Sequence, residues 1–188
     1  VKTLPAFVKL ARAKPGAINY GSGGHGASSH LAMELLKKTT QTDLVHVPYK
    51  SGGVSATALL AGEMQVMFAP IVAVLPQVRA NRLRALAVTT AKRSAGAPDV
   101  PTMGEAGMPG FELFQWYGVM VPTGTSRDIV DKLNTQLVTI LALPDVREKL
   151  QAQGIEPVGS SPAQLSTHLK SELVKWEKVV RMSGAKVD

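Results

Sequence analysis

Apolar and polar residues follow two different periodicities along the first half of the chain. Leu4 to Ala13 has apolar residues at helical spacing, and Pro15-Gly16 follows as a helix-terminating pair. Beyond this point, short runs of β-prone residues are separated by segments with helical spacing. The runs that predict strands are Ala17–Tyr20, Leu44–Val47, Met64–Phe68 and Leu83–Val88. The helical segments between them are predicted to end near Lys38, Gly62 and Ala80.

This alternation predicts an α/β fold with a doubly wound, mainly parallel sheet. The predicted strands are apolar on both faces, as buried parallel strands are. Ligands of such sheets bind beyond the carboxyl ends of the strands, where the strand-to-helix turns meet. We therefore expect the functional turns at Gly21–Gly26, Tyr49–Gly53, Ala69–Pro70 and Thr89–Thr90.

The pattern changes after Ala95. Residues 95–110 are rich in proline and glycine, which predicts a long surface loop with one helical turn at Thr102–Ala106. Phe111–Val121 is aromatic and apolar, and it predicts an extended strand. The rest predicts helices at Thr125–Leu143, from Pro144 to Gly154 and from Ser161 to Val180, with a few strand residues at Ile155–Val158.

Two motifs predict where these later helices begin. Thr125 with Asp128 fits a capping box, and Ser161-Pro162 fits a helix start. The helices have apolar faces but no sheet of their own to cover. We therefore divide the chain into a complete α/β lobe at residues 1–121 and the C-terminal helical part of another lobe at residues 122–188.

Composition narrows this picture only slightly. Of 188 residues, 45% are hydrophobic and none is cysteine, so the chain can bury a core but has no disulfide or thiolate chemistry. A net charge of +7 attracts anions of every kind. The basic residues between Arg79 and Arg93 have no aromatic residue among them, so we interpret them as a solvated face rather than a nucleic-acid site. No apolar run has the length of a membrane span, and no basic-then-apolar leader opens the chain.

The stretch from Ile18 to Leu31 contains the most informative motif. A β-prone run enters it, a glycine- and serine-rich turn follows, and a helical pattern leaves it. Glycine lets the backbone turn sharply, and a helix that starts there directs N–H groups and the positive end of its dipole into the turn. We therefore expect an anion to face the amides of Gly26 and Ala27, with serine hydroxyls as further donors.

Phosphate ligands fit this motif poorly. Gly21, Gly23 and Gly26 match the G-x-G-x-x-G of dinucleotide sites, but the acid expected at the end of the next strand is missing. Ala27 stands where a Walker A loop has lysine, and no serine of the turn has the glycine spacing of a hydrolase elbow. A small carboxylate is the simplest ligand, and a glycine-rich turn without a ligand is the alternative.

The titratable residues indicate no reactive centre. His25 and His30 are five residues apart, which would place them on different faces of a helix, so we expect no metal site. His46 and His168 are interpreted as structural or solvated. No carboxylate pair and no nucleophile beside a base is present, so the sequence supports neither catalysis nor a cofactor.

Several motifs together resemble a known family. GAINYGSGGHG at residues 16–26, followed by His30-Leu31, resembles the second-lobe signature of the Bug receptors, the solute-binding receptors of tripartite tricarboxylate transporters. Further matches follow in the same order along the whole chain. They are VPYKSG at 47–52, LRALAVT at 83–89, PDVPT at 98–102, EAG at 105–107, WYG at 116–118 and QGIEPV at 153–158.

The resemblance implies a fold like that of the type II periplasmic binding proteins. Two lobes would close on a small carboxylate in the periplasm and deliver it to membrane transporter subunits. Enzyme activity, a cofactor and a nucleic-acid partner are not expected. The ligand contacts implied by the family are Ser22, Gly23, Gly24, His25, Gly26, Ala27, Ser28, Tyr49, Ala69, Pro70 and Trp116.

Two departures from the family pattern bear on the ligand. Family members begin with a long part of the other lobe, whereas this chain begins near the second lobe, so half of the ligand clamp is expected to be absent. A second copy of the chain is one way to cover the helices left exposed. Family members often have an acid where this chain has Ala69. Because no acid lies in the predicted turns, we expect a solute without an amine.

Two other protein classes remain open on sequence. A ligand-sensing domain of a regulatory protein shares this architecture, although no helix-turn-helix segment is present. A phosphate-handling enzyme would need a lysine or an acid near Gly26.

Overall fold

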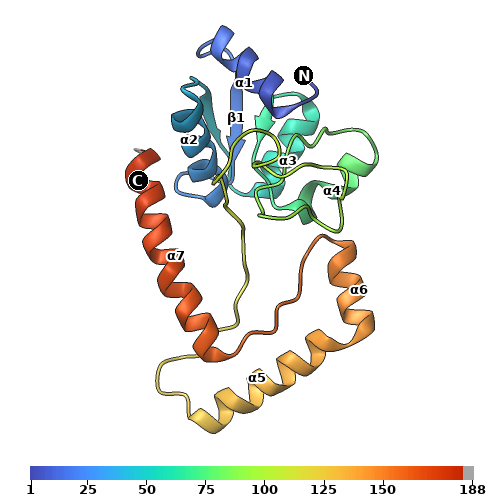
Figure 1. The fold of residues 1–188 in the computed structure, drawn as a ribbon, viewed down its shortest axis with the longest axis vertical. Coiled ribbons are helices and arrows are strands. Elements are labelled where there is room, and N and C mark those ends of the chain that lie inside the picture. Colours follow the sequence, from blue (N-terminus) through green and yellow to red (C-terminus); the bar gives the residue numbers. More distant parts are fainter. Residues whose placement is uncertain (184–188) are drawn as a thin grey trace.

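The computed structural model describes residues 1–183, which form three strands and seven helices (Figure 1). In chain order these are α1 (Leu4–Ala13), β1 (Asn19–Ser22), α2 (Ser28–Thr40), β2 (Val45–Pro48), α3 (Gly52–Ala61), β3 (Val66–Met67), α4 (Ile71–Arg79), α5 (Arg127–Ala142), α6 (Pro144–Ala152) and α7 (Pro162–Ser183). The predicted helix at Leu4–Ala13 is confirmed at both ends. Its N-terminus is capped by Thr3, whose hydroxyl accepts a hydrogen bond from the amide of Ala6.

The sheet has β1 at its centre, with β2 and β3 paired to it in parallel. Tyr20 of β1 lies beside His46 of β2 and Val66 of β3. Successive residues of a strand face opposite sides, so Tyr20, Ser22 and His46 share one face, and α2 packs against β1. The predicted α/β alternation and the parallel sheet are therefore confirmed for the first three strands.

Three other predicted strands are wrong. Leu83–Val88 is irregular apart from one bridge, in which Val88 exchanges backbone hydrogen bonds with Pro101 and Met103. Phe111–Val121 and Ile155–Val158 are also irregular. Residues 114–121 form no backbone hydrogen bond to any described residue. A β-prone run becomes a strand only when a second strand pairs with it, and within the described chain these segments have no such partner.

The core lies around β1, between α1, α2 and the segment from Met103 to Leu113. Tyr20, Met33 and Leu36 are almost completely buried there. The C-terminal half of α7 packs against α2 and contributes Val179 to the same core (Figure 1). The C-terminal end of the described part of α7 therefore packs on the core around β1, whereas its N-terminal end lies away from that core.

The later helices lie largely outside this core. Figure 1 shows α5 at the end of the molecule farthest from α1, and α5 has no buried residue. The side chains of Ile129, Leu133 and Ile140 are 53%, 43% and 46% exposed, so the apolar face predicted for this helix is uncovered among the described residues. No described helix is both long enough and apolar enough to cross a bilayer.

One of the two predicted helix starts is confirmed. Ser161 and Gln164 form a reciprocal capping box before α7, because each side chain accepts a hydrogen bond from the other residue's amide. The capping box at Thr125 and Asp128 is wrong. The Thr125 hydroxyl donates instead to the carbonyl of Pro122, and α5 begins after Ser126 without a side-chain cap.

Candidate functional site

Three strand-to-helix turns meet at the carboxyl edge of the sheet. The amide of Tyr49 donates to the carbonyl of Ser22 at 3.1 Å, which joins the ends of β1 and β2. A β-carbon built on Gly23 would lie 3.1 Å from the backbone nitrogen of Gly52, and one built on Gly52 would lie 4.0 Å from Pro70. The turns before α2, α3 and α4 are therefore in contact, and glycine at position 23 permits the close approach.

The glycine turn does not present its amides as we expected. Gly26 donates to Nδ1 of His30 at 3.1 Å, and Ala27 donates to the carbonyl of Gly24 at 3.3 Å. The amides of Gly23 and Gly24 are also engaged, with the hydroxyls of Ser29 and Ser22. The expectation that Gly26 and Ala27 face an anion is therefore wrong, because the polar side chains of the turn and of α2 satisfy these donors locally.

Unpaired donors lie slightly further along, in the first turns of three helices. Within the described chain, the following amides donate no hydrogen bond: Ser28, Ser29 and His30 of α2, Gly52 and Gly53 of α3, and Ile71 and Val72 of α4. Each helix also directs the positive end of its dipole to the same edge. Three such ends at one edge of the sheet can bind an anion without any charged side chain.

The other predicted ligand residues of the turns differ in how far they are buried. Ser22 is buried and its hydroxyl contacts Gly24 and His46, whereas Ser28 is exposed at the start of α2. Ala69 and Pro70 are half-buried directly before α4.

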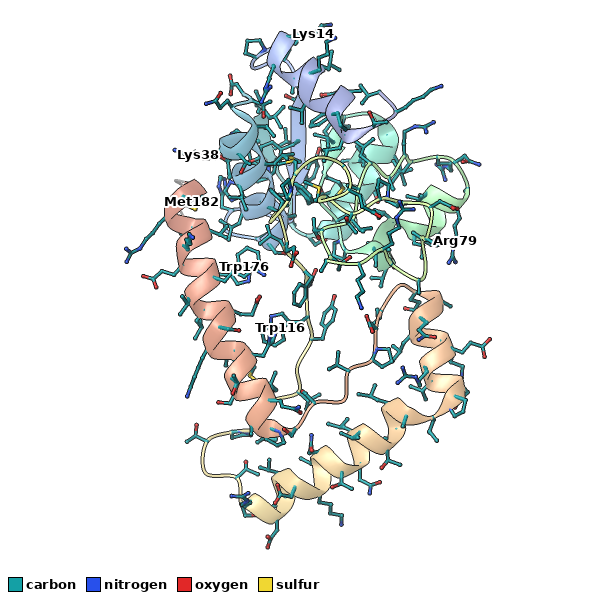
Figure 2. All side chains as sticks on the ribbon, in the orientation of Figure 1. Lys14, Lys38, Arg79, Trp116, Trp176 and Met182 are labelled. Carbon is teal, nitrogen blue, oxygen red and sulfur yellow. The ribbon has the colours of Figure 1, made fainter. Side chains whose placement is uncertain are left out.

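The two predicted aromatic contacts are positioned differently from the turns. The Tyr49 hydroxyl donates to Glu63, beyond the end of α3, so that group is already engaged. Trp116 lies on the irregular segment 114–121, where its ring packs edge-on against His168 of α7 with 5.1 Å between centroids (Figure 2).

A group of three histidines that sequence reasoning missed lies directly behind the glycine turn. His25 belongs to the turn rather than to α2. Its side chain is therefore not held on a different helix face from His30, as the five-residue spacing had suggested. The rings of His30 and His46 stack at 4.1 Å, and the His25 ring stands nearly perpendicular to both. One ring nitrogen from each residue lies within 4.8 Å of the others. The signal that identifies His46 is the strand register, which places it beside Tyr20 under α2.

Burial and hydrogen bonding shift the protonation of this region. Burial lowers the pKa of His46 to about 4, and the neighbouring His30 and His25 act in the same direction. Burial also lowers the pKa of His30, although Glu34 opposes this. Burial raises the pKa of the Tyr20 hydroxyl, and its hydrogen bond to Glu34 adds to the effect. The imidazoles of His30 and His46 are therefore neutral at pH 7.

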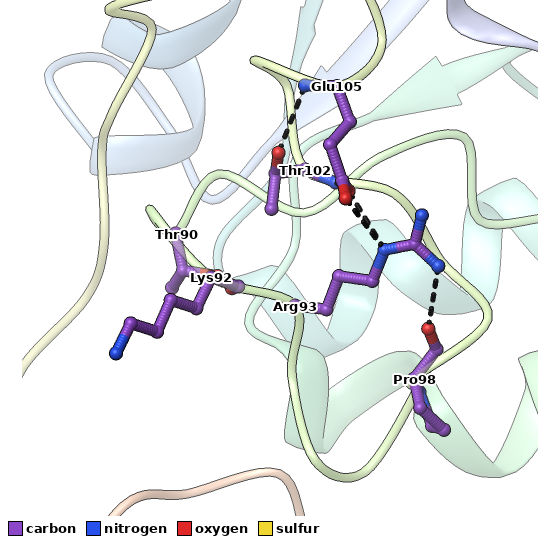
Figure 3. Close-up of polar contacts among 6 residues, drawn as sticks. All are labelled: Thr90, Lys92, Arg93, Pro98, Thr102 and Glu105. Carbon is purple, nitrogen blue, oxygen red and sulfur yellow. Dashed lines mark hydrogen bonds and ion pairs between the residues drawn. The ribbon is translucent and has the colours of Figure 1, made fainter.

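The basic residues between Arg79 and Arg93 serve partly to hold a loop. Arg93 donates to both carboxylate oxygens of Glu105, at 2.8 and 3.1 Å, and to the carbonyl of Pro98 (Figure 3). Glu105 also accepts from the amide of Thr102, and the hydrogen bond from Arg93 is the main reason that its pKa is lowered. These contacts give Arg93 a structural role within the 92–105 segment.

A cavity of about 850 Å³ lies elsewhere in the lobe. It is lined by α1, α2, α7 and the segment 106–113. None of the predicted ligand residues contributes to it, so the turns remain the better candidate site.

Comparison with known proteins identifies the family. The family described as "Tripartite tricarboxylate transporter family receptor" matches residues 1–185. BugT of Bordetella pertussis is 35% identical over 185 residues, which are 98% of this chain and 57% of BugT. The structure of R. palustris Rpa4515 with adipate has a TM-score of 0.93 at 35% identity, over 98% of this chain and 62% of that one. MatC of Rhodopseudomonas palustris, with bound malate, has a TM-score of 0.86 at 31% identity, over 95% and 62% of the two chains.

The present chain thus spans 57% to 62% of the length of these three proteins. The fold is also that of the periplasmic binding protein BugD, with a TM-score of 0.90 at 28% identity over 99% of this chain and 63% of that one. The chain belongs to the tripartite tricarboxylate transporter family of receptors.

Proposed function

We propose that the protein is a periplasmic receptor that binds a small carboxylate and delivers it to the membrane subunits of a tripartite transporter. The observation that carries this proposal is the meeting of three helix starts, α2, α3 and α4, at one edge of the sheet. The amides of the first two or three residues of each helix are unpaired among the described residues, and the helix dipoles favour negative charge.

The chemistry of the edge supports a carboxylate rather than a larger anion. No lysine lies at the glycine turn to reach a terminal phosphate, and no acid is placed to bind a ribose. Rpa4515 was solved with adipate and MatC with malate, both of which are dicarboxylates. A carboxylate needs only two or three donors, which the start of one of these helices can supply.

The same edge disfavours an amino acid. An ammonium group enclosed in a closed cleft needs an anionic partner, because an unpaired buried charge is strongly destabilising. The turns at 22–28, 49–53 and 69–70 contain no aspartate or glutamate. We therefore assign the receptor to mono-, di- or tricarboxylates without an amine.

In this proposal, the chain contributes residues to two lobes of the receptor. Residues 1–121 would form one lobe, and residues 122–188 would supply the helical part of the other, from which the C-terminal half of α7 returns to pack on the first. The uncovered apolar face of α5 supports this division, since a helix with such a face normally packs against further structure. The amides at the starts of α2, α3 and α4, together with Tyr49 and the Ala69–Pro70 turn, would bind one end of the solute, and Trp116 would line the path between the lobes.

A titration tests the proposal. The chain should be joined to the part of Rpa4515 that it does not cover, and the product titrated calorimetrically with adipate, succinate and citrate, and in parallel with aspartate and glutamate. We expect the carboxylates without an amine to bind more tightly. Tighter binding of the amino acids, or no binding of any carboxylate by a folded chimaera, would overturn it.

A further inference from the structure

We propose that His25, His30 and His46 form a binding site for a first-row divalent transition metal such as Zn²⁺. The three side chains come from the glycine turn, from α2 and from β2, yet one ring nitrogen of each lies within 4.8 Å of the other two. Three imidazoles that converge in this way match the ligand set of open zinc sites.

The hydrogen bonds around the cluster leave suitable ring nitrogens unprotonated. Nδ1 of His30 accepts a hydrogen bond from the amide of Gly26, so this nitrogen is unprotonated, and a metal ion bound to it would replace that hydrogen bond. Nε2 of His46 lies 2.6 Å from the Ser22 hydroxyl oxygen, and that hydroxyl can donate its single hydrogen to the carbonyl of Gly24. His46 then donates from Nε2 to Ser22 and keeps an unprotonated Nδ1. An oxygen acceptor behind the ring is the usual way in which a metal-binding imidazole is held.

The geometry requires a modest rearrangement on binding. With zinc–nitrogen bonds of about 2.0–2.1 Å, the nitrogens of a tetrahedral site lie roughly 3.3 Å apart. The rings of His30 and His46 are now parallel, so they must tilt before both lone pairs can meet one ion. His25 is exposed between two glycines, Gly24 and Gly26, that have positive φ angles, so it can move to complete the site. We therefore expect micromolar rather than nanomolar affinity.

The ligand set also determines which ions compete. Imidazole favours zinc, nickel and copper, whereas magnesium and calcium prefer oxygen ligands. Glu34 is the carboxylate whose charge affects the pKa of His30. It already accepts hydrogen bonds from Tyr20 and Lys37. A magnesium or calcium site is therefore not expected there.

Three protein ligands leave one coordination position of zinc open. Because His25 is exposed, a ligand from solvent can reach an ion bound there. A carboxylate oxygen is a suitable fourth ligand, so a bound ion would strengthen solute binding. This consequence rests on the proposed function, whereas the metal site itself does not.

The test uses the 188-residue chain without a polyhistidine tag, stripped with EDTA and dialysed. Calorimetric titration with ZnCl₂ at pH 7.5 should give one ion per chain. The absorption spectrum of a Co²⁺ complex should show the intense visible bands of four-coordination. His25→Ala should weaken zinc binding by at least about tenfold. His168→Ala is the matched control, because this fourth histidine lies on α7, and it should leave the affinity unchanged.

Three results would overturn the site: no binding of zinc at micromolar concentration, equal affinity in the chain and its His25→Ala variant, or half an ion per chain. Circular dichroism of His25→Ala verifies that the variant is folded, which its exposed position in the turn favours. Solute titrations performed in EDTA test the proposed function alone, so the two proposals can fail separately.

Discussion

The hydroxyl of Tyr20 donates a 2.5 Å hydrogen bond to Oε1 of Glu34. Tyr20 belongs to the central strand β1, and Glu34 belongs to α2, which packs over that strand. The same carboxylate oxygen accepts from Lys37 at 2.7 Å. Tyr20 is completely buried, so this pair links β1 to α2 directly behind the glycine turn. The position of the candidate site therefore depends on a buried polar contact as well as on apolar packing.

Tyr20→Phe is expected to lower the free energy of unfolding by about 1–3 kcal/mol. The change keeps the ring but removes a donor from a half-buried carboxylate, and hydrogen bonds to charged groups contribute in this range. Urea denaturation followed by circular dichroism measures the effect. Tyr49→Phe is the matched control, because its hydroxyl bonds to Glu63 at an exposed position and its loss should have a smaller effect. Equal losses in the two variants would contradict the assigned role of Tyr20.

The pKa of Glu34 predicts how stability changes in acid. Burial alone would raise this pKa, but the hydrogen bonds from Lys37 and Tyr20 outweigh it and lower the pKa below 4.5. A group with a depressed pKa in the folded state stabilises the protein above its unfolded pKa, and that contribution is lost as the pH falls through the folded value. Unfolding of the chain in EDTA should therefore become easier below pH 4.5. Glu34→Gln should show a flatter acid limb, and parallel limbs in the two proteins would refute the prediction.

Local pattern was sufficient for the described helices but not for every strand. Apolar spacing located each of the seven described helices within a few residues. A strand also depends on a partner that is distant in sequence, and the spacing of Phe111–Val121 does not reveal whether one is present. The same limit explains the histidine cluster. His46 joins His30 only through the register of β2 with β1, which no local pattern specifies.

The glycine turn shows a related limit. Its sequence correctly predicted a sharp turn followed by a helix. The backbone amides of Gly26 and Ala27, which were expected to face an anion, instead donate hydrogen bonds within the turn and to α2. Ser29 and His30, one helical turn later, accept hydrogen bonds from Gly23 and Gly26. Because serine and histidine side chains compete for backbone donors, the unpaired amides move to the first residues of the helices.

Gly21→Ala should destabilise the protein by about 1–3 kcal/mol. An added β-carbon would overlap the side chains of Met64 and Ser55, both of which are buried. Gly53→Ala offers the matched control. It lies in α3, and the nearest atom to its β-carbon would be 4.0 Å away, so the change should be neutral or stabilising by up to about 1 kcal/mol. Thermal denaturation compares the two variants, and a Gly21→Ala protein as stable as the parent would show that this part of the core repacks freely.

The uncovered face of α5 predicts self-association of the chain. Each of its apolar side chains would gain roughly 1.5–3 kcal/mol from full burial. Sedimentation at increasing concentration should show association, and Leu133→Glu should reduce it without lowering the unfolding midpoint. Gln136→Glu adds the same charge to a polar exposed position of α5 and is expected to leave association unchanged. A chain that stays monomeric at high concentration and binds no hydrophobic dye would contradict this expectation.

Ala69→Asp should shift the solute preference of the completed receptor toward amino acids. Position 69 is half-buried directly before α4, at the edge where the three turns meet. A carboxylate there would supply the anionic partner that an ammonium needs, and it would repel a dicarboxylate that lies close by. In the chimaera described above, we expect succinate or adipate to bind about tenfold more weakly and aspartate or glutamate more tightly, as measured by calorimetry at low ionic strength. Ala69→Asn has a similar shape without the charge, so it should weaken the dicarboxylates less and gain no affinity for amino acids. If the aspartate and asparagine variants behave alike, the absence of an acid at position 69 does not determine the solute class.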